Sequence, residues 1–126
     1  METEYPGRPR VAVIEDDAAI ARLVREILDA EGFDTLAVDR RTPIDAVRSH
    51  RPQLLLLDLL LGDAHGRDIL AALRRDGLAD VPVVLFSASP DLKSHMDSVG
   101  AVAFVTKPFD IDDLVATCRS VTATYA

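Results

Sequence analysis

The chain has 126 residues, of which 48% are hydrophobic and 28% charged, a balance typical of one globular domain rather than of a disordered chain. Its net charge of −7, from 14 Lys and Arg against 21 Asp and Glu, argues against direct binding to nucleic acid or to an anionic membrane. No apolar run is long enough to span a membrane, no signal peptide is apparent, and the expected location is cytoplasmic.

The apolar pattern predicts five strands that alternate with helices. Short apolar runs between polar residues are typical of strands buried on both faces of a parallel sheet. This alternation favours an α/β fold with right-handed crossovers and helices on both faces. Residues 1–10 are expected to form a flexible tail and residues 11–126 the domain. The predicted strands are Val11–Ile14, Phe33–Val38, Leu54–Leu57, Val81–Phe86 and Ala101–Thr106.

Helical spacing predicts the elements between these strands. The clearest is an amphipathic stripe that ends at Gly32, a typical helix stop; its members are Ile20, Leu23, Val24, Ile27 and Leu28. A helix in Ser89–Gly100 is expected to be short or irregular because this stretch carries Pro90. Cys118 falls on the apolar stripe of the last helix, which predicts a buried thiol. The other helices are expected over Thr42–His50, over Arg67–Asp76, and from Asp110, which suits an N-cap.

Polar side chains follow the strands at the edge where ligands bind in doubly wound sheets. An acidic run alone is more typical of a solvated loop or of a helix start. If the first and third strands are neighbours, however, their backbones lie about 4.8 Å apart, and Asp16 and Asp58 can reach one cation. The residues at this edge are Glu15, Asp16 and Asp17 after the first strand, Asp58 after the third, Ser87 after the fourth and Lys107 after the fifth.

Carboxylates gathered in this way predict a hard divalent cation with oxygen ligands, for which Mg²⁺ is the natural candidate. Asp58 would be the nucleophile of a phosphoryl transfer, because Lys107 and the hydroxyl of Ser87 can face the oxygens of the transferred group. The sequence therefore predicts a phosphoryl-transfer site at this edge.

The sequence from Val11 to Tyr125 resembles the receiver domains of response regulators in two-component signalling. The resemblance implies a flavodoxin-like fold, with a five-stranded parallel sheet in the order 2-1-3-4-5 and five helices on its two faces. The segments that carry it are Val11–Asp16, Leu57-Asp58 with Gly66, Ser87-Ala88, Gly100-Ala101 with Phe104, and Lys107-Pro108-Phe109.

The resemblance assigns a role to each residue around Asp58, which becomes the phosphoryl acceptor. Mg²⁺, for which Mn²⁺ can substitute, would be bound by Asp16, by Asp58 and by the backbone carbonyl of Leu60. Glu15 would hold a metal-bound water. Lys107 would pair with the phosphoryl oxygens.

The resemblance also implies how phosphorylation is read and how long it lasts. Ser87 would bond a phosphoryl oxygen, and Phe104, the aromatic switch, would turn into the space that Ser87 vacates. Ala88 would leave room for the phosphoryl group, and Leu60 and Ser89 would control the access of water. The hypothesis that apolar Leu60 slows hydrolysis is tested by the dephosphorylation half-life of Leu60→Asn, where no change would reject it.

The implied partners are a histidine kinase or a histidine phosphotransfer protein as donor, with acetyl phosphate as a small substitute. A downstream protein would bind the face of the fourth helix, fifth strand and fifth helix. The domain would be a self-modifying switch rather than an enzyme, because slow hydrolysis of its own aspartyl phosphate resets it. Two alternatives stay open: a phosphorylation-independent pseudo-receiver that binds proteins, and the N-terminal receiver fragment of a larger regulator.

Two other classes fit the residues less well. A phosphatase of the haloacid dehalogenase type would need an acid two residues after Asp58, where Leu60 stands. A flavin-binding flavodoxin would need a phosphate-binding loop after the first strand. Acids occupy that position here and would repel a phosphate in the absence of a metal.

Overall fold

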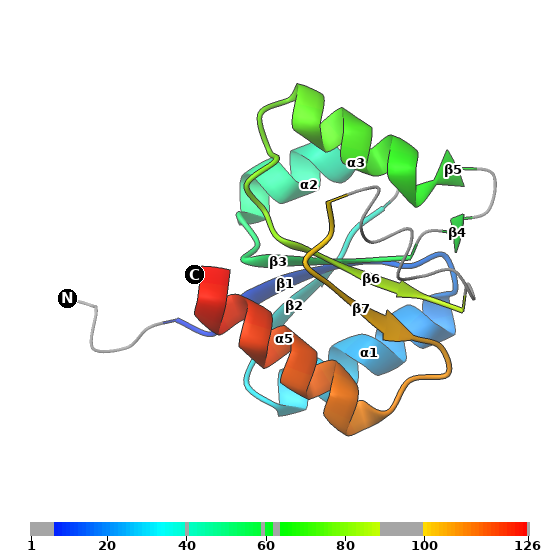
Figure 1. Cartoon of the computed structure of the whole chain (residues 1–126), viewed down its shortest axis with the longest axis vertical. Helices are drawn as coiled ribbons and strands as arrows, with labels where there is room; N and C mark the ends of the chain where they lie inside the picture. Colours follow the sequence, from blue (N-terminus) through cyan, green and yellow to red (C-terminus); the bar gives the residue numbers. More distant parts are fainter. Residues whose placement is uncertain (1–6, 40, 59, 62–63, 89–99, 126) are drawn as a thin grey trace.

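The fold is built on a parallel five-stranded sheet. The computed structural model describes residues 7–39, 41–58, 60–61, 64–88 and 100–125. The sheet has the order β2-β1-β3-β6-β7, which is 2-1-3-4-5 when its strands are counted along the chain, and this confirms the predicted fold class (Figure 1). The strands are β1 (Arg10–Ile14), β2 (Asp34–Ala37), β3 (Leu54–Leu57), β6 (Val83–Ser87) and β7 (Ala103–Thr106).

Helices cover both faces of this sheet (Figure 1). Helices α1 (Ala18–Ala30) and α5 (Ile111–Tyr125) lie on one face. Helices α2 (Pro43–His50) and α3 (Gly66–Arg75) lie on the other. Five helices were predicted, and the described residues form these four, because most of the predicted fourth helix lies outside them.

Two differences from the predicted strands have local causes. The fourth strand of the sheet starts at Val83 rather than Val81, because Pro82 has no N–H to donate, although its carbonyl accepts the N–H of Leu55 at 2.9 Å. A small antiparallel pair, β4 (Leu60–Leu61) and β5 (Ala64–His65), was not predicted. Strands of two residues are too short to show a period of alternation.

Side chains and glycines set the helix ends where the sequence indicates. Asp17 caps α1, since its Oδ1 accepts the N–H groups of Ala19 at 2.9 Å and Ile20 at 3.2 Å. Beyond its other end, Gly32 has φ +97°, a left-handed conformation that favours glycine. Asp110 caps α5, as predicted, through the N–H of Asp112 at 2.8 Å.

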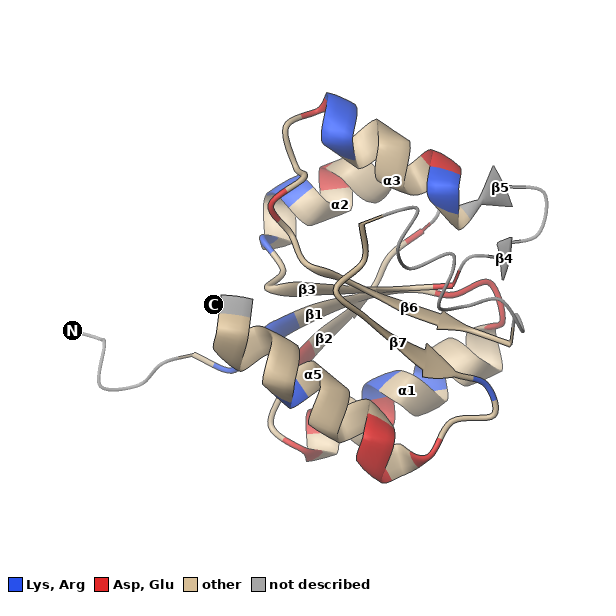
Figure 2. Ribbon diagram, in the orientation of Figure 1, with Lys and Arg blue, Asp and Glu red and all other residues tan. Residues whose placement is uncertain are grey.

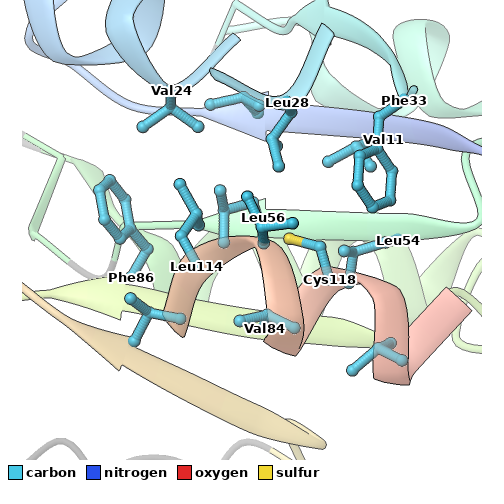
Figure 3. Packing of buried hydrophobic residues seen from close by; sticks show 14 residues of the cluster. Val11, Val24, Leu28, Phe33, Leu54, Leu56, Val84, Phe86, Leu114 and Cys118 are labelled. Atoms are coloured by element: carbon cyan, nitrogen blue, oxygen red, sulfur yellow. The ribbon is translucent and has the colours of Figure 1, made fainter. Parts of the chain in front are cut away.

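Each face of the sheet carries its own hydrophobic core. Successive residues of β3 point to opposite faces: Leu54 and Leu56 toward α1 and α5, Leu55 and Leu57 toward α2 and α3. Figure 3 shows the first cluster, in which Cys118 is fully buried. This confirms the predicted buried cysteine, and the burial raises the pKa of its thiol to about 12.

Among the described residues, no helix has the length and the apolar character that crossing a membrane requires. The cytoplasmic location stays a prediction.

The burial of β3 predicts how much one central leucine contributes. Leu56 is fully buried, whereas Leu23 on α1 is 48% exposed. Leu56→Ala should lower the free energy of unfolding by about 2–5 kcal/mol, because the substitution leaves a cavity between the sheet and its helices. The matched change Leu23→Ala should cost less than about 0.5 kcal/mol. Urea denaturation measures both, and equal losses would contradict the described core.

Candidate functional site

The strand order brings four strand ends to one edge of the sheet. Ile14 lies opposite Leu57 in the register of β1 and β3, and the N–H of Asp58 donates to the carbonyl of Ile14 at 3.0 Å. On the other side, the N–H of Lys107 donates to the carbonyl of Ser87 at 3.0 Å. Figure 2 shows acidic residues in the turn after β1 and a basic residue beyond the arrowhead of β7, at the same end of the sheet.

Lys107 joins the two halves of this edge. Its Nζ donates to Oδ2 of Asp58 at 2.9 Å and to Oε1 of Glu15. The three side chains are largely removed from water, with exposed fractions of 17% for Lys107, 7% for Asp58 and 2% for Glu15. The centre of the site is thus one ammonium between two carboxylates from neighbouring strands.

Glu15 is held through both of its carboxylate oxygens. Lys107 bonds Oε1, and Oε2 accepts the N–H of Asp17 at 3.1 Å. Burial raises the pKa of Glu15 above its ordinary 4.5, and the charge of Asp58 adds to this effect, while the hydrogen bonds from Lys107 and Asp17 oppose it. Glu15 therefore ionises less readily than a solvated glutamate.

The same hydrogen bond that lowers the pKa of Glu15 raises the pKa of Lys107. Burial by itself would lower the pKa of Lys107, but its hydrogen bonds to Glu15 and Asp58 and the charges of both raise that pKa above 10.5. Lys107 is therefore a permanent cation at this edge. Its peptide bond to Pro108 is cis.

The other predicted site residues surround this centre. Asp16 is exposed, and with Glu15 it lines an open pocket of about 290 Å³ that Asp39 and Arg41 also line. Ser87 is the last residue of β6 and is 1% exposed.

The predicted switch and access residues lie further out. Phe104 on β7 is 37% exposed, so in this structure it is a surface aromatic and not part of the core. Ala88 is exposed next to the buried Ser87. Leu60 belongs to β4, of which only the backbone is described, and Ser89 lies outside the described residues.

The donor atoms at this edge suit a hard cation. Glu15, Asp16 and Asp58 offer carboxylate oxygens, and Mg²⁺ characteristically keeps several waters and binds through one or two carboxylates and a phosphate. Within the described ranges, no group of three or more His, Cys, Asp or Glu side chains could hold a metal ion by itself.

Sequence reasoning missed Phe86, the residue before Ser87. Its ring lies under Lys107, with Nζ 4.8 Å from the ring centroid. Two signals were available: an aromatic residue next to a predicted site residue, and the parallel pairing of the last two strands, which brings Phe86 close to Lys107. The strand pairing indicates this proximity only when the register is known, and the structure shows that Ser87 lies opposite Thr106.

Comparisons with known proteins agree with this geometry. The family model of the response regulator receiver domain matches residues 11–119. The chain is 38% identical over 116 residues to the DNA-binding response regulator MtrA of Mycobacterium tuberculosis, covering 90% of this chain and 50% of that protein. It is 36% identical over 123 residues to the alkaline phosphatase synthesis transcriptional regulatory protein SphR of Synechococcus elongatus, covering 88% and 48%.

Solved structures show the same architecture. The signal receiver domain of a putative LuxO repressor from Vibrio parahaemolyticus superposes with a TM-score of 0.82 and 29% identity, over 94% of this chain and 92% of that one. The chain thus matches an isolated receiver domain along nearly its whole length, but spans about half the length of the curated relatives named above.

The raised pKa of Glu15 predicts a pH dependence of stability. The folded chain keeps this proton to a higher pH than the unfolded chain does, so the stabilising contribution is complete below pH 4.5 and is lost as pH rises through the raised pKa. The variant Glu15→Gln has no proton to release at this position, so its stability lacks this pH-dependent loss. The free energy of unfolding of this variant, minus that of the native chain, should therefore increase from pH 4.5 upward.

Urea denaturation at a series of pH values measures this difference. Glu26→Gln, which removes a carboxylate that is 62% exposed, controls for the loss of one negative charge. A difference for Glu15→Gln that falls with pH, or that merely equals that of the control, would contradict the assignment.

Proposed function

The chain belongs to the response regulator receiver family, and on this premise we propose that Asp58 accepts a phosphoryl group from a phosphohistidine. The family implies a kinase as partner. The donor would be a histidine kinase or a histidine phosphotransfer protein, and acetyl phosphate could replace it. The modified domain would then signal through a changed surface.

The observation that carries this proposal is the setting of Asp58. The residue is 5% exposed, at the end of a buried strand, and the ammonium of Lys107 lies 2.9 Å from one of its carboxylate oxygens. Asp58 is one of three buried polar or charged residues in the described chain, and another, Ser87, ends the adjacent strand. Such burial has a cost, and a reactive role for the group explains it.

The bond changes of this transfer are simple. An oxygen of the Asp58 carboxylate attacks phosphorus, and a P–O bond forms as the P–N bond of phosphohistidine breaks. The imidazole leaves in its neutral form, with its proton on the ring nitrogen that did not carry the phosphoryl group. In hydrolysis, water attacks phosphorus, the bond to Asp58 breaks, and inorganic phosphate leaves. Lys107 would stabilise the charge that gathers on the phosphoryl oxygens in both steps.

A divalent cation would complete the site. We propose that Asp16, Asp58 and the backbone carbonyl of Leu60 hold Mg²⁺, with Glu15 bonding a coordinated water. When bound, Mg²⁺ or Mn²⁺ supplies the positive charge that lets a dianionic donor approach these acids. Lys107 alone provides one positive charge against several carboxylates, which is why phosphorylation should require the metal.

Phosphorylation of Asp58 would change the surface of the domain through Ser87 and Phe104. We propose that the hydroxyl of Ser87 bonds a phosphoryl oxygen, with Ala88 leaving room, and that Phe104 turns inward from its exposed position on β7. A downstream protein would then sense the surface of β7 and α5. Because the aspartyl phosphate is itself the product and resets by hydrolysis, the domain acts as a switch and not as an enzyme on other substrates.

DNA contact is proposed to lie outside this domain. The relatives named as DNA-binding are about twice as long as the matched region, and the net charge of this chain is −7. Any DNA binding by a longer protein would then belong to its remaining half.

Intact mass after incubation with Mg²⁺ and acetyl phosphate tests this function. The native chain should gain the mass of one phosphoryl group, and chelation of the metal should abolish the gain. Asp58→Asn should gain nothing. Asp68→Asn, which removes an exposed acid from the first turn of α3, is the matched control and should be modified like the native chain.

Two results would overturn the proposal. Label that persists in Asp58→Asn would place the acceptor elsewhere. A native chain that takes no phosphoryl group from acetyl phosphate, or from any histidine kinase offered, would support the pseudo-receiver alternative.

A further inference from the structure

The aromatic ring of Phe86 contacts the ammonium of Lys107. The ring is fully buried, and Nζ lies 4.8 Å from its centroid. Figure 3 shows Phe86 in the apolar layer between the sheet and α5, together with Leu56 and Leu114. The ring is therefore fixed from below by the core and presents its face to a charged group at the edge of the sheet.

A second aromatic residue fixes the orientation of this face. The ring of Phe109 lies 5.3 Å from that of Phe86, centroid to centroid, with 59° between the ring planes. Tilted pairs at this separation are a favoured aromatic arrangement. Phe109 follows Lys107 by two residues, so one short segment supplies both the cation and the ring that braces Phe86.

The contact has the conditions under which cation–π attraction is strong. A cation within about 6 Å of a ring centroid is attracted by the negative face of the ring, most strongly when both are removed from water. Lys107 is 17% exposed and Phe86 fully buried. Among the residues that the structure describes, the ammonium thus has three partners: Glu15, Asp58 and the ring of Phe86.

These three partners differ in one respect that matters for the reaction. Both carboxylates change during the proposed function, because Asp58 becomes an acyl phosphate and Glu15 is proposed to bond a metal-bound water. The ring carries no charge to lose and binds no metal ion. It is the contact that can hold the ammonium while its carboxylate partners change.

We propose that Phe86 is a positioning residue that keeps the ammonium of Lys107 at the oxygens of Asp58 through the face of its ring. This inference rests on the proposed phosphorylation of Asp58. It adds to that function an aromatic support for the cation, built from the strand that also carries Ser87.

Fluorination of Phe86 separates the electronic role from the packing role. Site-specific incorporation of mono-, di- and trifluorinated phenylalanine weakens the negative face in steps while the shape of the ring changes little. The rate constant of phosphorylation by acetyl phosphate should fall with each step, by roughly 5- to 30-fold in all. The same series at Phe33, a buried aromatic residue of the same core cluster, is the matched control and should leave the rate unchanged.

A second measurement needs neither metal nor phosphoryl donor. The sequence contains two lysines, Lys93 and Lys107, so nitrogen-15 labelling of lysine gives two ammonium signals that Lys93→Arg assigns. Hydrogen exchange between the Lys107 ammonium and water should accelerate along the fluorine series at Phe86 and not along that at Phe33. A purely structural role for Phe86 would not produce this change.

The outcomes distinguish this inference from the function on which it rests. Exchange and phosphorylation rates that stay constant along the Phe86 series, in a native chain that is modified on Asp58, would overturn the inference alone. A native chain that is not phosphorylated would overturn the proposed function, and the exchange measurement would still decide whether the ring holds the ammonium.

Discussion

The ion pairs of Lys107 with Glu15 and Asp58 are the interaction on which this edge of the sheet depends. Two carboxylates with little solvent contact repel each other, and each bears a desolvation cost that a positive charge offsets. Lys107 supplies that charge from the end of the edge strand β7, whereas its partners follow the more central strands β1 and β3. Loss of the ammonium would remove the ion-pair partner that these two buried acids share.

The strand order makes this contact possible, and the two cores hold it in place. With β1 beside β3, the main chains that lead to Glu15 and Asp58 are joined by a hydrogen bond from the N–H of Asp58 to the carbonyl of Ile14. With β6 between β3 and β7, Lys107 must cross one strand to reach them, and the residue it crosses is Phe86. A fully buried central strand thus serves both packing and chemistry: its leucines fill the two cores, and its end presents Asp58.

Local rules and the family resemblance predicted most of the architecture. The apolar runs marked every strand of the sheet, and Gly32 and Asp110 were predicted to set helix ends through backbone conformation and capping, which depend on few neighbours. The Glu15–Lys107 contact was not predicted, because it joins residues 92 positions apart and depends on side-chain reach as well as on register. The exposure of Phe104 was equally beyond sequence reasoning, since a switch residue and a core aromatic share one apolar pattern.

The central claim is that Asp58 accepts the phosphoryl group, and chemical trapping tests it most directly. Borohydride reduces an acyl phosphate to an alcohol, so reduction of the chain after incubation with Mg²⁺ and acetyl phosphate should convert aspartate to homoserine at position 58 only. Fragment masses of the proteolysed chain locate the change. Homoserine at Asp16, a reduced side chain at Glu15, or no trapped product in a chain that carries the phosphoryl group would contradict the account.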